Sequence, residues 1–272
     1  MLELLDDGDV IGLSRSAITA SKPVLLFDLD SCAELPIEPP DDYCVLYTVA
    51  PATDSKRDAR LERLLVSLSP PPTAFVYIST TGVYGDRGGA LVDEQAEPSP
   101  MTARAERRVA AEQALLQWCA DHSVRLCILR APGIYGPGRL ALKRIREAAP
   151  LLREADANPG NRIHADDLAA CCIAALTSDA ATGIINVGDG DERSSTWFAG
   201  EVARQAGLEA PPLVSRDEAE KTFPAHRLSY LKESRRVDTR RMRDVLRVTP
   251  RYAKAEDGIR ASLAAEALAD QG

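Results

Sequence analysis

The sequence predicts a doubly wound α/β fold, in which helices cover both faces of a parallel sheet. Two observations carry this prediction. Short runs that are apolar on both faces alternate along the chain with stretches of helical period, which is typical of buried parallel strands joined by crossover helices. The chain has 272 residues, 45% of them apolar, which is enough for a sizeable core in one large domain or two modest ones. Ligands of such a sheet bind outside the carboxyl ends of its strands.

Three of the predicted strands lie near the start of the chain, over residues 10–13, 24–27 and 43–49. Each is a short apolar run that ends at polar residues or at a proline. A helix is predicted over 54–68, where apolar residues recur at helical spacing and three prolines follow soon after. Residues 2–8 resemble the last turn of another helix with a glycine cap.

The middle of the chain carries the clearest alternation. A strand rich in β-branched and aromatic residues, 74–79, precedes an Ala- and Glu-rich helix over 102–121, and a further strand follows over 124–130. After residue 133 the alternation loosens. The remaining predicted elements are the helices 139–149, 165–177, 195–207, 239–246 and 261–269 and the strand 184–187. We therefore predict a sheet-forming core over 1–190, with part of a smaller lobe inserted after residue 133, and a small C-terminal lobe over 191–272.

The overall charge argues against several classes of partner. Lysines and arginines number 33 against 41 aspartates and glutamates, a formal net charge of −8. Nucleic acids and anionic membranes are therefore not expected as partners, because binding to phosphates depends on clustered cations. No apolar run approaches the ~18 residues of a membrane span, and the acidic start differs from the basic start of a signal peptide. We expect a cytoplasmic protein.

Cysteines and histidines give no sign of a metal site. The six cysteines contain no C-x-x-C spacing and the three histidines lie far from any pair of cysteines, so zinc is not expected. Without a secretory context, the cysteines are expected to be small buried hydrophobes in a reducing compartment. His164 and the two aspartates that follow it suggest a metal or catalytic pair, but we interpret Asp166 or Asp167 as the cap of the next helix.

Hydroxyl residues cluster where the predicted strand 74–79 ends. Ser79, Thr80 and Thr81 stand in a row and a glycine follows them. At the carboxyl edge of a sheet, such side chains can donate hydrogen bonds to a substrate oxygen. The same residues could instead satisfy backbone groups of the local turn and nothing else. Spacing alone leaves both interpretations open.

Residues 76–85 (VYISTTGVYG) resemble a strand and turn of the extended short-chain dehydrogenase/reductase family, which includes sugar-nucleotide epimerases and dehydratases. Three further segments match in order: 129–138 (LRAPGIYGPG), 161–169 (NRIHADDLA) and 186–188 (NVG). The chain is therefore identified as an atypical member of this family. The resemblance implies a Rossmann-type doubly wound parallel sheet with a small C-terminal substrate lobe.

The resemblance further implies an NAD(P)-binding oxidoreductase or epimerase/dehydratase-like enzyme that acts on a small hydroxylated or sugar-nucleotide-like substrate. The family's catalytic groups are a Ser or Thr, a Tyr and a Lys. Alignment through the VYG turn puts Thr80 at the Ser/Thr position, whereas Arg104 stands where the Tyr belongs and Arg108 where the Lys belongs. A guanidinium, with a pKa above about 12, cannot exchange protons near neutral pH.

The resemblance therefore implies a modified division of roles. Thr80 is expected to orient the substrate oxygen, and Arg108 to contact the cofactor ribose or a phosphate. The proton is expected to pass through water or Tyr135, with Tyr84 as the other candidate. Arginines at the two family positions also suggest a function of a different class, a non-catalytic dinucleotide-binding sensor or scaffold. A small molecule is the expected partner, and family members often form homodimers through the helices that correspond to 54–68 and 102–121.

The cofactor that the resemblance implies is NADP or NAD, although part of its site is missing from the sequence. The family's G-x-x-G-x-x-G turn, which holds the pyrophosphate, does not occur near the start, and about 25–30 residues with the family's first strand are expected to be lacking. Either the sequence starts too far downstream in its gene, or the chain has lost this phosphate-binding turn. An arginine between two serines at 14–16 suits a 2′-phosphate and favours NADP. The residues predicted to bind the cofactor are Ser14, Arg15, Ser16, Asp28, Leu29, Ala50, Pro51 and Arg108.

Overall fold

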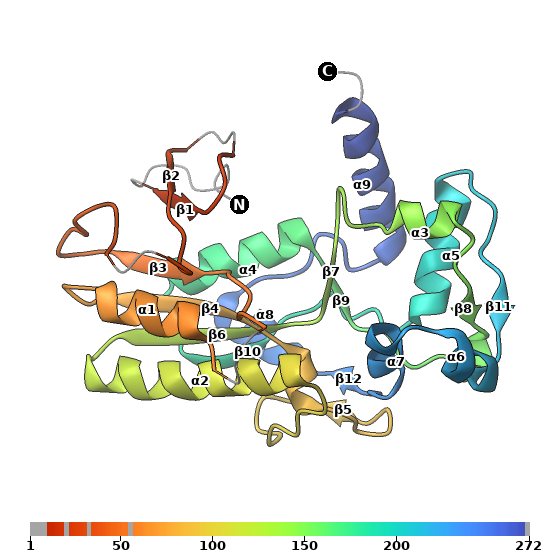
Figure 1. Cartoon of the computed structure of the whole chain (residues 1–272), viewed down its shortest axis with the longest axis horizontal. Coiled ribbons are helices and arrows are strands. Elements are labelled where there is room, and N and C mark those ends of the chain that lie inside the picture. The colour runs from red at the N-terminus through yellow and green to blue at the C-terminus, as the bar shows by residue number, and fades with distance from the viewer. Residues whose placement is uncertain (1–9, 19–21, 32–33, 54–56, 270–272) are drawn as a thin grey trace.

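The computed structural model of the chain describes residues 10–18, 22–31, 34–53 and 57–269 (Figure 1). Its centre is a four-stranded parallel sheet in the order β10–β6–β4–β3. The strands are β3 (Cys44–Tyr47), β4 (Ala74–Thr80), β6 (Arg125–Ala131) and β10 (Gly183–Asn186). The helices packed on this sheet are α1 (Ala59–Ser67), α2 (Ala103–Asp121), α4 (Ala165–Thr177) and α8 (Arg240–Leu246).

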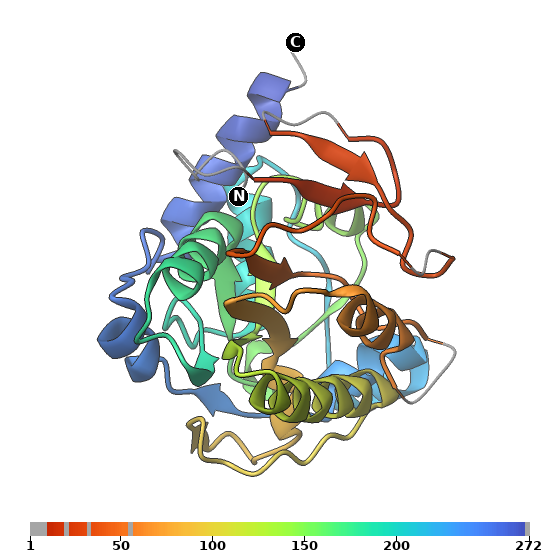
Figure 2. The same cartoon turned by 90° about the vertical axis from the view of Figure 1, so that its left-hand side faces the viewer.

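Helices cover both faces of this sheet, as Figure 2 shows in end view. Alternate residues of β4 enter different cores: Phe75 and Tyr77 pack with α1 and α2, whereas Val76 packs with α4 and α8. In β6, Ile128 and Cys127 divide in the same way between the two cores. Strands that are buried on both faces read as continuous apolar runs, which is why the sequence predicted them. The predicted doubly wound α/β class is confirmed.

A separate two-stranded parallel sheet lies beyond β3. It consists of β1 (Gly12–Ser14) and β2 (Val24–Leu26), with Leu13 opposite Leu25. Among the described strands, β3 pairs with β4 alone, so β1 and β2 do not join the four-stranded sheet. Figure 1 shows the pair at the upper left, above the edge at β3.

The remaining elements gather at the right of Figure 1 and below the sheet. Short strand pairs join distant segments, and the helices between them are brief except α5 and α9. The strand pairs are β7 (Gly133–Tyr135) with β9 (Arg162–His164), β8 (Leu151–Leu152) with β11 (Leu213–Val214), and β5 (Leu91–Val92) with β12 (Arg236–Val237). The helices are α3 (Leu142–Arg146), α5 (Ser195–Gln205), α6 (Arg216–Thr222), α7 (Ala225–Leu231) and α9 (Ala255–Ala269), with 3₁₀ turns η2 (Thr81–Tyr84) and η3 (Glu154–Asp156). We call α3, α5, α6, α7 and α9 with β8 and β11 the second lobe.

Several helices differ from the sequence prediction. The helix predicted over 139–149 is only the five-residue α3, whereas the predicted tail helix 261–269 begins earlier, at Ala255. Helices α6 and α7 were not predicted. The turn predicted within residues 2–8 lies outside the described residues. Within the described ranges, no helix combines the length and apolar character that crossing a bilayer requires.

The predicted cap of α4 is wrong. The N-cap is His164, whose Nδ1 accepts a hydrogen bond from the backbone N–H of Asp166 at 3.1 Å. Asp167 is buried and accepts instead from the backbone N–H groups of Arg251 and Tyr252, at 2.7 and 3.1 Å. The two aspartates lie in the first turn, so their charge still faces the positive end of the helix dipole, but the carboxylate of Asp167 fixes a distant loop.

Two helical glycines make a matched pair for a stability experiment. A Cβ at Gly258 in α9 would lie 2.5 Å from the phenol oxygen of Tyr135, whereas a Cβ at Gly200 in α5 would have no such neighbour within 4 Å. We expect Gly258→Ala to lower the free energy of unfolding by about 1–3 kcal/mol through overpacking. Gly200→Ala should raise it by about 0.5–1 kcal/mol, because alanine is preferred inside a helix. Urea denaturation measures both, and shifts of the same sign would contradict this packing.

Candidate functional site

The hydroxyl cluster lies at the carboxyl edge of the four-stranded sheet, where β4 ends. Ser79 is buried and its hydroxyl donates to the carboxylate of Glu112 in α2. Thr80 is half-buried, and its Oγ1 accepts from the backbone N–H of Gly82 at 3.1 Å as the cap of η2. The O–H of Thr80 has no acceptor among the described residues. Ser79 thus bonds a distant side chain and no backbone group of the turn, whereas Thr80 satisfies a backbone group of the turn and keeps its O–H for a ligand oxygen.

A buried ion pair joins β6 to α2 behind this cluster. Arg130 of β6 donates from Nε and Nη2 to the two oxygens of Glu112, at 3.1 and 2.6 Å. The guanidinium carbon of Arg130 also lies 4.8 Å from the ring centre of Tyr84, whose hydroxyl donates to Asn186 at 2.7 Å. Burial raises the pKa of Tyr84, and its proton is already held by the Asn186 oxygen. These contacts engage the hydroxyl proton and the ring of Tyr84 within the protein.

Arg108 lies at the same edge, between β3 and β4. Its Nη1 donates to the hydroxyl of Tyr77 and to the carbonyl of Ile78, both at 2.9 Å. These acceptors are neutral, so its charge is not balanced by an ion pair among the described residues. Burial raises the pKa of Tyr77 to about 12 despite the neighbouring guanidinium. The residue at the family's tyrosine position, Arg104, lies instead over the ring of Tyr230 in α7, 4.5 Å from its centre.

Tyr135 lies on β7, which pairs with β9 and not with the four-stranded sheet. Its ring is buried and meets the rings of His164 and Phe198 edge-on, each with centroids 5.1 Å apart. Its hydroxyl has no partner among the described residues. Burial, with the nearby Asp189 carboxylate, raises the pKa of Tyr135. The structure therefore places the two predicted catalytic groups, Thr80 and Tyr135, on different sheets.

The segments predicted to bind the adenosine part of the cofactor meet around Arg60 of α1. This arginine donates to both carboxylate oxygens of Asp30, at 2.7 and 2.5 Å, and to the carbonyl of Ala50 at 3.1 Å. Arg63 donates to the carbonyl of Leu29 at 2.7 Å. Sequence reasoning missed Arg60 and Arg63, although two arginines three residues apart within the predicted helix 54–68 were a signal that could have found them.

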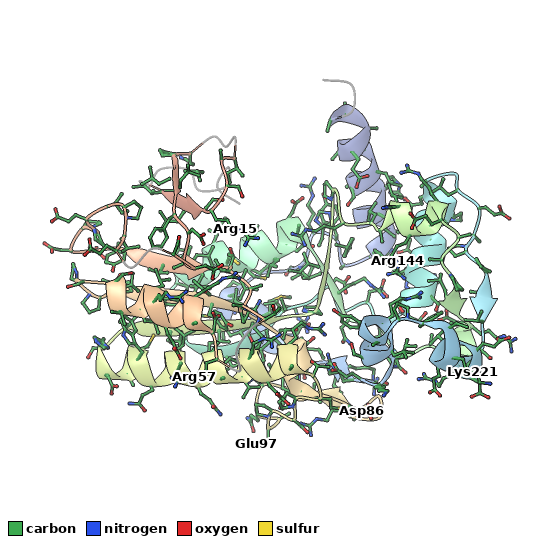
Figure 3. All side chains as sticks on the ribbon, viewed as in Figure 1. Arg15, Arg57, Asp86, Glu97, Arg144 and Lys221 are labelled. Atoms are coloured by element: carbon green, nitrogen blue, oxygen red, sulfur yellow. The ribbon has the colours of Figure 1, made fainter. Side chains whose placement is uncertain are left out.

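Positive charge is in excess where these segments meet. The hydrogen bonds from Arg60, with the charges of Arg60, Arg63 and Arg15, hold the pKa of Asp30 below its usual value. Figure 3 shows Arg15 where the two-stranded sheet faces the rest of the molecule. Ser14 accepts from the backbone N–H of Ser16 at 3.3 Å and closes the turn that carries Arg15. Three cations lie near two carboxylates, Asp28 and Asp30, so one positive charge is in excess and fits a phosphate.

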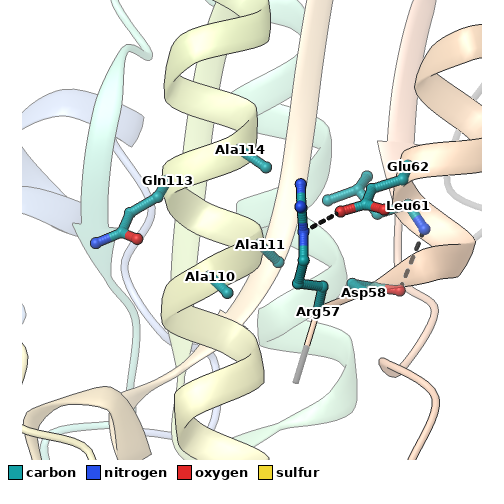
Figure 4. A pocket seen from close by; sticks show the side chains of 8 residues that line it. All are labelled: Arg57, Asp58, Leu61, Glu62, Ala110, Ala111, Gln113 and Ala114. Atoms are coloured by element: carbon teal, nitrogen blue, oxygen red, sulfur yellow. Dashed lines mark hydrogen bonds and ion pairs between the residues drawn. The ribbon is translucent and has the colours of Figure 1, made fainter. Parts of the chain in front are cut away.

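Two cavities adjoin these elements. One, of about 300 Å³, lies between α1 and α2, where small alanines face Leu61 and the buried Asp58 and where Arg57 pairs with Glu62 (Figure 4). The other, of about 320 Å³, lies against β7, β9 and the second lobe. It is lined by Gly133, Ile134, Tyr135, Arg139, Leu152, Asn158, Pro159, Gly160, Asn161, Arg162, Ser195, Phe198, Tyr230, Leu231 and Glu233. Only this second cavity combines aromatic walls with cations and a carboxylate, and we call it the inter-lobe cavity.

Comparison with known proteins decides the family. The profile of the NAD dependent epimerase/dehydratase family matches residues 51–188, which span the sheet edge and the turns described above. The chain belongs to this family. The resemblance inferred from four short segments is thereby confirmed.

Solved structures of this epimerase/dehydratase fold align with nearly the whole chain. A functionally unknown conserved protein from Silicibacter pomeroyi is 29% identical, with a TM-score of 0.76, covering 94% of this chain and 89% of that one. MoeE5 in complex with UDP-glucose and NAD is 18% identical, with a TM-score of 0.74 and coverages of 97% and 92%. RMD from Pseudomonas aeruginosa complexed with NADPH is 20% identical, with a TM-score of 0.67 and coverages of 92% and 91%. Among curated proteins, none matches the chain.

Proposed function

We propose that the protein binds NADP(H) at the carboxyl edge of its sheet and uses it on a small hydroxylated substrate that reaches from the inter-lobe cavity to Thr80 at this edge. One observation carries the proposal: the segments at Ser14–Ser16, Asp28–Leu29 and Ala50–Pro51 converge on a cluster of arginines. The excess positive charge there supports NADP over NAD, since the two cofactors differ by a 2′-phosphate. Structural neighbours solved with NAD or NADPH support a nicotinamide dinucleotide in general.

In the proposed reaction, residues of this chain would have the following roles. A bound nicotinamide supplies or accepts the hydride. Thr80 donates its free O–H to the substrate oxygen. The hydrogen bond from Ser79 to Glu112 keeps this end of β4 in place. Arg108 presents an unpaired charge next to Thr80's strand and contacts the cofactor ribose or a phosphate. Water or Tyr135 carries the proton.

A second candidate function, dinucleotide binding without turnover, is favoured by the two arginines at the family's catalytic positions. Arg104 lies on Tyr230, Arg108 is held by strand oxygens, and neither guanidinium can exchange a proton near neutral pH. A sensor of this kind would bind NADPH and would oxidise none of it with any keto or hydroxylated compound. An enzyme would show substrate-dependent oxidation that Thr80→Ala abolishes.

Arg15→Ala tests the cofactor site. Loss of one charged contact to the 2′-phosphate should weaken NADPH binding about tenfold or more, whereas NADH binding should change less than twofold. Fluorescence titration of the reduced cofactors measures both affinities. Arg57→Ala serves as the matched control, because Arg57 is exposed and pairs with Glu62 beside the cavity between α1 and α2, not with Asp30. Equal losses for NADPH and NADH, or no loss, would contradict the assignment.

We also propose that α1 and α2 form a homodimer surface. Val66 on α1 is 86% exposed and Leu116 on α2 is 47% exposed, so both apolar side chains are available to a second copy. The cavity between the two helices adds a concave strip lined by small alanines (Figure 4). Burial of such side chains against a second copy would stabilise a dimer.

The cytoplasm is the compartment that we propose. The five described cysteines are free thiols, and Cys119, Cys127, Cys171 and Cys172 are buried. Burial raises the pKa of these four thiols, so they do not ionise readily. Thiols in this state suit a reducing compartment, whereas oxidising compartments favour disulfides.

A further inference from the structure

The inter-lobe cavity has one uncompensated charge. Of its two arginines, Arg162 is paired with Asp191 at 3.3 Å and donates to the carbonyls of Arg193 and Ser194. Arg139 is exposed, and its guanidinium has no hydrogen-bond or ion-pair partner within the described part of the chain. A ligand in this cavity can therefore form an ion pair with Arg139.

The single carboxylate that lines the cavity, Glu233, keeps one oxygen free. Its side chain is 4% exposed, and Oε2 accepts from Arg235 at 2.9 Å. Oε1 is buried without any hydrogen-bond donor among the described residues. A buried charged oxygen without a donor is costly, so a ligand that brings an O–H to Oε1 would gain more than a contact at the surface.

The segment that carries Glu233 is rigidly held. Asn158 donates from Nδ2 to the carbonyls of Leu231 and Glu233, at 3.0 and 3.2 Å. Asn161 donates to the carbonyl of Arg235 at 2.8 Å. Both asparagines line the cavity, so the position of the free oxygen is set by the cavity wall itself. Pre-organisation of this kind favours a specific ligand over a loosely bound one.

The cavity is small, and α7 borders it. Its volume of about 320 Å³ lies at the lower end of the range for small-molecule sites. Tyr230, which lines it, is held by the cation–π contact with Arg104, so α2 and α7 meet at its wall. We expect a ligand that extends from the cavity past Tyr230 to meet this exposed contact.

Together these features specify a class of substrate, and this step rests on the function proposed above. We propose that the inter-lobe cavity takes a small hydroxylated carboxylic acid, such as a free sugar acid, rather than a nucleotide-linked sugar. Arg139 binds the carboxylate, and Glu233 accepts a hydrogen bond from one of the hydroxyls. One free cation matches one carboxylate, whereas a diphosphate brings two negative charges to the same site.

Isothermal titration of the full chain with three probes tests this proposal. D-glucuronate and D-glucose differ only in a carboxylate at the sixth carbon, and UDP-glucose carries the nucleotide. We expect D-glucuronate to bind saturably and D-glucose and UDP-glucose to bind at least about tenfold more weakly, because a charged hydrogen bond is worth that much. Arg139→Ala should remove the preference for D-glucuronate over D-glucose, and Arg139→Lys should restore part of it.

Glu233→Gln should weaken D-glucuronate about tenfold, and Tyr230→Ala should strengthen UDP-glucose relative to the wild type. Far-UV circular dichroism melts establish that each variant is folded. Equal binding of D-glucose and D-glucuronate, tighter binding of UDP-glucose, or no saturable binding of D-glucuronate would each overturn the proposal. NADPH titration of the same preparation separates the two questions: NADPH binding without D-glucuronate binding overturns the substrate class alone, and the reverse overturns the cofactor proposal alone.

Discussion

Replacement of Glu112 by alanine is expected to lower the free energy of unfolding by about 3–5 kcal/mol, the usual loss when one partner of a buried ion pair is removed. The side chains of Arg130 and Glu112 are 2% and 4% exposed, so the guanidinium would remain buried without its counter-charge. Nη1 of Arg130 already has no hydrogen-bond partner among the described residues, and the hydroxyl of Ser79 would lose its acceptor as well. Equilibrium denaturation in urea measures the loss.

Two further variants show whether burial causes this loss. Arg260→Ala breaks a surface pair with Asp257, whose side chains are 69% and 51% exposed, and should change stability by about 0.5 kcal/mol or less. The double variant Glu112→Leu with Arg130→Met leaves no charge unpaired and should be more stable than Glu112→Ala. A single-variant loss no larger than that of Arg260→Ala would show that the pair is not shielded from water.

The sequence predicted the sheet well because its strands are buried on both faces. The run 74–79 corresponds to β4 and the run 124–130 to β6, and both are continuous enough to recognise without any partner. Strand pairs such as β8 with β11 could not be predicted, because each strand has two residues and its partner lies far along the chain. Two residues show no periodicity, so only the tertiary contact defines such a strand.

The candidate site was predicted where its residues follow strands and missed elsewhere. Strand ends placed Arg15, Asp28 and Ala50 at one edge, and the structure brings their segments together. The connecting residue, Arg60, was missed because its contacts depend on how α1 packs, and its three-residue spacing from Arg63 was the local signal. Glu233 was missed for the same reason, since its free oxygen results from burial and not from a motif.

Asp189→Asn is expected to stabilise the protein at alkaline pH. Burial raises the pKa of Asp189 to about 7, and its Oδ2 has no hydrogen-bond partner among the described residues. Its unfolded pKa is near 3.9, so above about pH 7 the native state carries a buried charge that costs at most about 4 kcal/mol. Asparagine keeps the acceptor that binds the backbone N–H of Asp191, at 2.8 Å in the wild type, but removes the charge.

The pH dependence is the decisive measurement. Below about pH 4 Asp189 is protonated in both states, so the wild type and Asp189→Asn should unfold at similar urea concentrations. Between about pH 4 and 7 the wild type should lose stability relative to the variant, and above pH 7 the difference should be constant. An advantage for the variant that did not change with pH would point to packing instead of charge.

Asp191→Asn provides a control in the same loop with the opposite sign. Burial alone would raise the pKa of Asp191, but hydrogen bonds from Arg193 and the charges of Arg162 and Arg193 outweigh it, so this pKa lies below its usual value. The variant should be destabilised at neutral pH, and the loss should disappear as pH falls through the lowered pKa. Neighbouring carboxylates with opposite responses would exclude a general effect of loop charge.

The two-stranded sheet of β1 and β2 determines where cofactor binding should change local stability. Its strands have three residues each and pair only with one another among the described strands, and Leu26 and Ile11 are 65% and 44% exposed. Amide protons here should exchange with solvent through local opening, whereas those of β4 should exchange only when the whole core unfolds. Arg15 follows β1 directly. A dinucleotide that binds Arg15 should therefore make the opening of β1 and β2 more cooperative with the unfolding of the main sheet.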